Sequence, residues 1–157
     1  MRMMRMGSAV VVTVLGLGLL TPRGITAEDG PETEVLGVVT TLFDGMREKD
    51  EAKLRSVFHA DARLHSAGSP DQGTPIEGFI QSVLGNPGLL DEVTFDEQVL
   101  VDGALGVAWT PYNLFVNGDF IHCGVDAFTM VRTSEGWKIL QIVDTRVEEG
   151  CDPTRRG

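Results

Sequence analysis

The sequence predicts an α+β domain in which helices come first and a long antiparallel meander of strands follows. Near the start of the chain, apolar residues recur at three- and four-residue steps, as they do on the buried stripe of a helix. From residue 91 to residue 148 the pattern changes to short alternating runs. These are separated by the strong hairpin signal Asn117-Gly118 and by Ser134-Glu135-Gly136. Helices followed by a meander favour a layer of helices on one face of a sheet.

Three helices are expected. The stripe of the first contains Val35, Val38, Val39, Leu42, Phe43 and Met46. Asp50 is placed to cap a short second helix that reaches about residue 58, because its side chain can accept from a free backbone N–H of the first turn. The third helix, over 76–84, ends at Gly85-Asn86-Pro87. Between the second and third helices, 61–66 is predicted to be a short strand and 67–75 a loop.

Four strands complete the prediction, at about 91–101, 104–116, 119–132 and 137–147. With residues 117 and 118 as the loop, His122 lies opposite Asn113, and Asp126 lies opposite Trp109. With 134 and 135 as the next loop, Asp126 also lies opposite Val143. Because side chains alternate between the two faces of a sheet, one face then mixes large apolar groups with polar ones. The residues of that face are Trp109, Asn113, His122, Asp126, Phe128, Met130, Trp137, Ile139, Gln141 and Val143.

A face of this composition is typical of a small-molecule pocket. The expected ligand-binding residues are Trp109, Asn113, His122, Asp126, Trp137 and Gln141. His122 and Asp126 are about 13 Å apart in a regular strand, so they can contact two ends of one ligand but not each other. Burial would raise the pKa of Asp126, as a general base requires. The alternative is a structural role, in which both are hydrogen-bonded to the backbone or to Asn113 and Gln141.

The opposite face of the sheet predicts a second apolar surface. It contains Val125, Ala127, Thr129, Val131, Leu140 and Ile142. Because helices can cover only one side of the sheet, we expect a two-fold homodimer through this face. Coverage by the short, charged C-terminal tail is the alternative. The same alternation places Tyr112 on this outer face, which weakens the case for an enzyme, although a β-bulge in the long strand would reverse its direction.

The N-terminus has the layout of an export signal. Arg2 and Arg5 precede a short apolar run over 8–20, and Ile25-Thr26-Ala27 offers a cleavage site. We therefore expect a signal peptide cleaved near Ala27, a periplasmic or secreted protein, and no stable membrane anchor; an uncleaved anchor is the alternative. The net charge of −10 argues against binding to nucleic acid or to an anionic membrane.

Cys123 and Cys151 are the two cysteines of the sequence. In an exported protein such a pair favours a disulfide over two free thiols. No His or Lys is placed to activate either thiol, so neither is expected to be catalytic.

The histidines suggest no metal site. His59, Asp61 and His65 could be combined with the remote His122, but this spacing is generic, and polar residues on the surface or a sheet edge are the expected alternative. The sequence has no phosphate loop and no dinucleotide fingerprint. We therefore expect no metal and no cofactor.

The order of elements and several strings resemble the nuclear transport factor 2-like (NTF2-like) superfamily of cystatin-like, cone-shaped α+β domains. The strings are FHADARLHS at 58–66, HCGVDAF at 122–128, GWKI at 136–139 and DTR at 144–146. Over about residues 33–151 the chain is similar to one branch, catalogued as putative lumazine-binding proteins. The resemblance implies a cone with a pocket beneath its first helix. It does not imply that lumazine is the ligand, because members of the branch largely lack assigned activities.

The sequence thus predicts a signal peptide (1–27), a flexible lead (28–32), one domain (33–151) and a tail (152–157). The expected function is binding of an unidentified small molecule in the concave face of the sheet. One alternative is a cyclase- or isomerase-like enzyme, with Asp126 as the base and His122 polarising a carbonyl. A dimeric assembly module is a further alternative.

Overall fold

The computed structural model describes residues 30–155, so the predicted signal peptide lies outside the described residues. The helices are α1 (Pro31–Glu48), α2 (Glu51–Val57) and α3 (Ile76–Gly85). The strands are β1 (Phe58–Ser66), β2 (Ser69–Pro75), β3 (Leu90–Thr94), β4 (Gln98–Asp102), β5 (Leu105–Val116), β6 (Asp119–Thr133) and β7 (Gly136–Asp144). The predicted α+β class is confirmed. Within residues 30–155, no helix combines the length and apolar character needed to cross a membrane.

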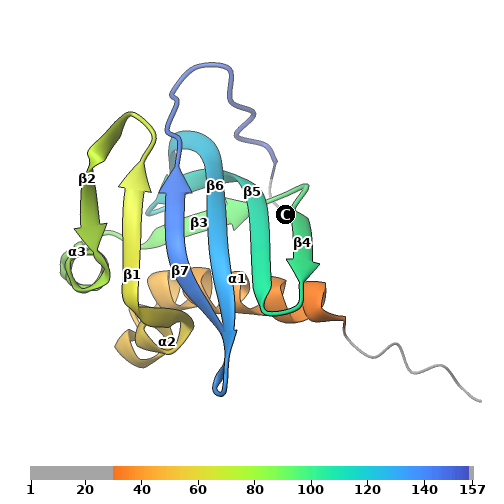
Figure 1. Ribbon diagram of the computed structural model, residues 1–157. Helices are drawn as coiled ribbons and strands as arrows, with labels where there is room; N and C mark the ends of the chain where they lie inside the picture. Colours follow the sequence, from red (N-terminus) through yellow and green to blue (C-terminus); the bar gives the residue numbers. More distant parts are fainter. Residues whose placement is uncertain (1–29, 156–157) are drawn as a thin grey trace, which may run out of the picture.

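The strands form one curved sheet in the order β2-β1-β7-β6-β5-β3, and β4 also pairs with β5 (Figure 1). β5, β6 and β7 are antiparallel neighbours, as the two turn signals predicted. β1 pairs with β7 in parallel, so the sheet is mixed. Figure 1 shows α1 running across one face of this sheet, with α2 near the start of β1 and α3 beside β2. This arrangement leaves the other face of the sheet free of helices.

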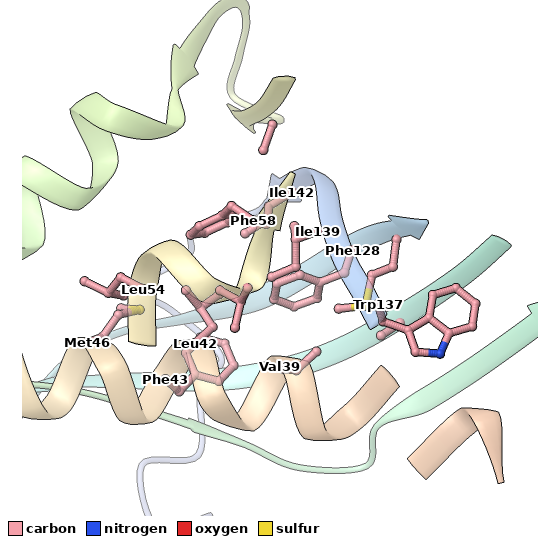
Figure 2. Packing of buried hydrophobic residues seen from close by; sticks show 14 of the residues in the cluster. Val39, Leu42, Phe43, Met46, Leu54, Phe58, Phe128, Trp137, Ile139 and Ile142 are labelled. Atoms are coloured by element: carbon pink, nitrogen blue, oxygen red, sulfur yellow. The ribbon is translucent and has the colours of Figure 1, made fainter. Parts of the chain in front are cut away.

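The apolar stripe of α1 supplies the centre of the core. Val35, Val39, Leu42, Phe43 and Met46 are all buried, and the Phe43 ring meets the Phe128 ring edge-on at 6.2 Å between centroids (Figure 2). The helix begins at Pro31, within the predicted flexible lead. At α2, the Asp50 side chain accepts from the backbone N–H of Lys53 at 3.1 Å, which confirms the predicted cap.

Two segments differ from the predicted elements. The strand predicted over 91–101 is divided into β3 and β4 at Asp96, whose φ of 52° interrupts the extended backbone. The loop predicted over 67–75 contains β2, an exposed edge strand that pairs only with β1. Since β2 buries little on either face, it has no alternation of apolar residues from which it could be predicted.

A β-bulge in β6 changes the predicted pairing with β5. Next to the Asn117-Gly118 turn, Phe115 lies opposite Phe120, as predicted, but Leu114 lies opposite His122. Ile121 is therefore an extra residue in β6, and every later pair is displaced by one. Asp126 lies opposite Thr110, and Trp109 lies opposite Ala127.

This displacement reverses the faces of β5. The prediction that Trp109 and Asn113 share a face with His122 and Asp126 was wrong, and so was the outward direction of Tyr112. Trp109 projects from the outer face and is 49% exposed, whereas Tyr112 is buried beneath the helices. A bulge adds one residue to one strand only, so alternation continues in each strand while the relation between the strands changes.

A second bulge has the same effect on β7. Met130 lies opposite Ile139, as predicted, but Thr129 lies opposite Gln141, so Leu140 is the extra residue. The prediction that Gln141 and Val143 face inward was therefore wrong. Three residues of β7 and the segment after it line the core side instead: Ile142, Asp144 and Arg146. Ile142 was predicted on the outer face, and it is buried in the core.

The segment after β7 stays paired with β6 as far as Val147, and the tail then contacts the outer face of the sheet. Val147 and Cys123 exchange two backbone hydrogen bonds of 3.0 and 2.9 Å, and Cys123 forms a disulfide with Cys151, which confirms the predicted bridge. The Asn113 side chain donates to the carbonyl oxygens of Asp152 and Arg155, both at 2.9 Å. The tail thus covers one end of the outer face, the alternative that the sequence left open for this surface.

The remainder of the outer face still exposes an indole, Trp109. Homodimerisation through this face stays a prediction, which native mass spectrometry at low micromolar concentration tests. A purely monomeric mass there would contradict it.

We expect loss of the disulfide to destabilise the fold without abolishing it. The bridge joins residues 28 apart, and closing a loop of this length stabilises the folded state by about 3.5 kcal/mol on the chain-entropy model. Urea unfolding of the double variant Cys123→Ser/Cys151→Ser checks this, with the unreduced wild type as reference. An unchanged unfolding midpoint would contradict the structural role of the bridge.

Candidate functional site

A cavity of about 200 Å³ lies between α1, α3 and the inner face of the sheet. One part of its wall is apolar and the other is polar. The apolar wall comprises Leu42, Phe43, Met46, Leu64, Phe79, Val83, Leu90, Leu114, Phe128 and Ile142. The polar wall comprises Ser82, Glu92, Tyr112, His122, Asp126, Asp144 and Arg146. This combination of apolar walls with a few convergent polar groups is the usual composition of a ligand pocket.

Three carboxyl groups meet at the polar wall, each from a different strand. Glu92 comes from β3, Asp126 from β6 and Asp144 from β7. Asp126 and Asp144 lie directly opposite each other on neighbouring strands, and both are buried. Like charges at directly opposed positions of a sheet repel, and burial increases the cost of holding both ionised. The cluster is therefore expected to retain a proton.

Glu92 and Asp126 are the pair in this cluster whose carboxyl groups interact by a side-chain hydrogen bond, and the pKa of each is raised. Burial raises the pKa of Glu92 well above its usual range, and the negative charge of Asp126 raises it further. Burial also raises the pKa of Asp126 to about 7, with a further contribution from Asp144. The hydrogen bond with Glu92 and the positive charge of Arg146 lower the pKa of Asp126, but by less than burial raises it. Both shifts have burial as their first cause, so the pair keeps a proton at a pH where exposed carboxyl groups have lost theirs.

Asp144 has one satisfied oxygen and one unsatisfied oxygen. Arg146 Nε donates to Oδ2 at 2.7 Å, which forms an ion pair at the mouth of the cavity. Oδ1 is buried and has no hydrogen-bond partner among the described residues. A buried carboxylate oxygen without a donor is costly, so this atom is a position where a ligand or a water molecule would be stabilised.

Tyr112 and His122 form the remaining side of the polar wall. The Tyr112 hydroxyl donates to the carbonyl oxygen of Thr145 at 2.9 Å and lies 3.4 Å from His122 Nδ1. Burial, with added negative charge from the carboxyl groups of the polar wall, raises the pKa of the Tyr112 hydroxyl far above its usual value, so it keeps its proton. Burial and the charge of Arg146 lower the pKa of His122, so the imidazole is neutral at pH 7.

Gly124 makes this arrangement possible. A Cβ at this position would lie 1.9 Å from the carbonyl oxygen of Thr145 and 2.9 Å from Cε1 of Tyr112. Only glycine allows the backbone after β7 to approach β6 so closely while the Tyr112 ring lies across it. The same approach brings Arg146 to the cavity.

Two of the predicted site residues reach the cavity and four do not. His122 and Asp126 line it, and their role in binding or catalysis stays a prediction. Three of the others project from the opposite face, because the two bulges displace the register by one residue: Trp109, Asn113 and Gln141. Trp137 is on the inner face but packs near the start of α1, where its Nε1 donates to Glu34 at 3.1 Å.

Sequence reasoning missed five polar residues of the wall: Ser82, Glu92, Tyr112, Asp144 and Arg146. The DTR string at 144–146 marked Asp144 and Arg146 as part of the family resemblance, but the expected register placed both on the outer face. Glu92 gave no signal, because β3 is short and half-buried along its whole length. Among the described residues, no group of three His, Cys, Asp or Glu side chains is arranged to hold a metal ion.

Solved structures with the same architecture come from several bacteria. A protein from Streptomyces avermitilis, described as a putative dehydratase of the NTF2-like family, is similar with a TM-score of 0.64 and 19% identity, covering 74% of this chain and 95% of that one. A putative ketosteroid isomerase from Shewanella frigidimarina has a TM-score of 0.59 and 13% identity, covering 73% and 97%. An NTF2-like protein with a cystatin-like fold from Novosphingobium aromaticivorans has a TM-score of 0.60 and 14% identity, covering 75% and 82%. Identities this low establish the fold and leave the activity open.

The comparison with curated proteins gives no match to this chain. The family model described as "Putative lumazine-binding" matches residues 31–143, from the first residue of α1 almost to the end of β7. The matched region holds the curved sheet, all three helices and every cavity residue except Asp144 and Arg146. The chain therefore belongs to the putative lumazine-binding family, and its fold is similar to that of the NTF2-like, cystatin-like structures.

Proposed function

We propose that this protein binds a small organic molecule in the cavity beneath α1. The observation that carries the proposal is the division of the cavity into an apolar wall and a polar wall that retains an unsatisfied, buried acceptor. An apolar wall supplies contact area, and a few polar groups fix the orientation of a ligand.

The size of the cavity limits the ligand. A cavity of roughly 150 Å³ lined by aliphatic and aromatic side chains accepts benzene. At about 200 Å³, this cavity accommodates one ring with a short substituent, or an aliphatic chain of similar volume. Larger ligands would have to extend through the mouth, past Ser82 and Arg146, which are both exposed.

A tryptophan at Ser82 is expected to block the cavity. Ser82 lies on α3, is exposed and lines the cavity, so a large ring there narrows the mouth without disturbing the core. Its exposed neighbour Gln81 lies outside the cavity wall, so Gln81→Trp is a matched control. We expect single-ring compounds to give saturation-transfer NMR signals with the wild type and with Gln81→Trp, and these signals to be lost with Ser82→Trp. Equal signals from all three proteins would contradict binding in this cavity.

The carboxyl pair favours one second candidate, proton transfer by an enzyme of isomerase or cyclase type. Asp126 would remove a proton from a carbon next to a carbonyl group, and His122 would polarise that carbonyl by hydrogen bonding. A carboxyl with a pKa of about 7 is suited to accept and return a proton at neutral pH. Tyr112 does not serve as an oxyanion donor in this arrangement, because its proton is already donated to Thr145.

The raised pKa of Asp126 gives a specific dependence of stability on pH. Between pH 4 and pH 7 the folded state holds a proton on Asp126 that the unfolded chain has lost, so stability falls as the pH rises through this range. The slope from one such group reaches about 1.4 kcal/mol per pH unit. Urea unfolding at several pH values should show this slope in the wild type and a flatter profile in Asp126→Asn.

NMR titration of the side-chain carboxyl carbons provides the direct measurement for the same residue. A resonance that titrates near pH 7 and disappears in Asp126→Asn supports the base role. If the Asp126 carboxyl titrates near pH 4, like an exposed aspartate, that role is untenable.

We also infer that the protein acts outside the cytosol. A disulfide such as Cys123–Cys151 persists in oxidising compartments, and it agrees with the export signal predicted in residues 1–27. The intact mass of protein recovered from the periplasm or the medium tests this, because cleavage near Ala27 removes the N-terminal segment. A full-length mass in the cytosolic fraction alone would contradict export.

A further inference from the structure

We infer that the ligand of this cavity carries a protonated amine at one end of a small apolar body. This inference rests on the proposed binding function and adds the chemical class of the ligand. It is carried by the kinds of polar atom that the cavity presents and by the balance of charges along its wall.

The polar wall is rich in acceptors. Asp144 is more than nine-tenths buried, and its Oδ1 has no hydrogen-bond partner among the described residues. Asp126, which is also more than nine-tenths buried, lies opposite Asp144 and interacts with the carboxyl group of Glu92. The Tyr112 hydroxyl donates its hydrogen to the carbonyl oxygen of Thr145, so toward a ligand it can act only as an acceptor. A ligand that donates several hydrogen bonds satisfies these atoms, and an ammonium group donates three.

The charges of the wall leave one negative charge without a partner. Arg146 is the cationic residue of the cavity wall, and it is paired with Asp144 at 2.7 Å. His122 is neutral at pH 7, because burial lowers its pKa. The Glu92–Asp126 pair, once it has lost one of its two protons, is therefore an anion with no cation of the protein beside it. A ligand cation would supply the missing partner.

Anionic and neutral ligands fit this wall less well. A carboxylate or phosphate would face three carboxyl groups and one guanidinium that is already paired. A neutral alcohol could donate to Asp144 Oδ1, but it would leave the charge of the carboxyl pair uncompensated.

The apolar wall determines the other end of the ligand. Phe43 and Phe128, whose rings meet edge to face, both line the cavity, as does Leu42 on α1. Flat aromatic or short aliphatic groups pack well against such rings. Benzylamine combines a single ring with a primary ammonium and is therefore a suitable probe.

Binding of such a cation should depend on pH. The titratable and charged groups that face the site are Glu92 from β3, Tyr112 from β5, His122 and Asp126 from β6, and Asp144 and Arg146 from β7 and the segment after it. The lining residues from α1, α3 and β1 carry no charge. Asp126 is the group among these that titrates near 7, so its ionised fraction rises from about a tenth at pH 6 to about nine-tenths at pH 8. An alkylamine stays protonated over this range.

The test compares three probes of the same size by calorimetry: benzylamine, benzyl alcohol and benzoate. We expect benzylamine to bind most tightly at pH 8 and about tenfold more weakly at pH 6. Benzyl alcohol should bind more weakly at pH 8 than the amine does, and benzoate most weakly of the three. Benzoate binding as tight as that of benzylamine, or benzylamine affinity that is equal at pH 6 and pH 8, overturns the inference.

Two variants separate charge recognition from general effects. Asp144→Asn removes one charge of the wall while keeping its shape, and we expect it to weaken benzylamine binding at least tenfold but to change benzyl alcohol binding little. Asp61→Asn is the matched control, because the Asp61 side chain is 86% exposed on β1, and it should bind both probes like the wild type. Circular dichroism of each variant at the temperature of the measurement verifies that it is folded. Equal benzylamine affinity in Asp144→Asn and the wild type overturns the inference.

The outcomes distinguish this inference from the proposed function. If benzyl alcohol or benzoate binds and Ser82→Trp abolishes that binding, while benzylamine shows no preference, the cavity binds ligands but the amine assignment is wrong. If none of the three probes binds, both the amine assignment and the proposed function for ligands of this size are overturned.

Discussion

The extra residue Ile121 in β6 determines which side chains reach the cavity. Without it, Tyr112 would project from the outer face and Trp109 would lie beneath α1. The second extra residue, Leu140, has the same consequence for β7, because it turns Asp144 toward Asp126. One bulge lies in β6, the longest strand of the sheet, and the other lies in its neighbour β7, and a bulge bends the strand that contains it. Curvature of the sheet and composition of the cavity therefore have one structural cause.

This placement gathers carboxyl groups that would repel one another if all were ionised. The raised pKa values of Glu92 and Asp126 let the pair keep a proton, which relieves part of the repulsion, and Arg146 relieves another part at Asp144. The unsatisfied oxygen of Asp144 does not stabilise the fold, since an apolar residue at this position would give a more stable core. A strand position that keeps such a group buried is more readily explained by ligand binding than by stability.

The sequence predicted those parts of the fold that depend on local chemistry. The apolar stripe of α1, the Asp50 cap and the Asn117-Gly118 turn, with positive φ at both residues, each have a signal within a few residues. The bulges have no such signal, because Ile121 and Leu140 are ordinary strand residues whose displacement follows from the packing of distant strands. One residue of register was enough to replace Trp109 and Asn113 by Tyr112 at the cavity. His122 and Asp126 were placed correctly because neither bulge lies between them.

The disulfide connects the stability of the fold to the geometry of the site. Cys123 lies between His122 and Gly124 on β6, and its bridge to Cys151 holds the returning chain against that strand. The two backbone hydrogen bonds between Cys123 and Val147 fix the same segment. Thr145, which accepts from Tyr112, and Arg146, which pairs with Asp144, lie within this segment. Because the polar wall depends on a piece of chain outside the regular sheet, the covalent bond there limits the freedom of the groups that a ligand would contact.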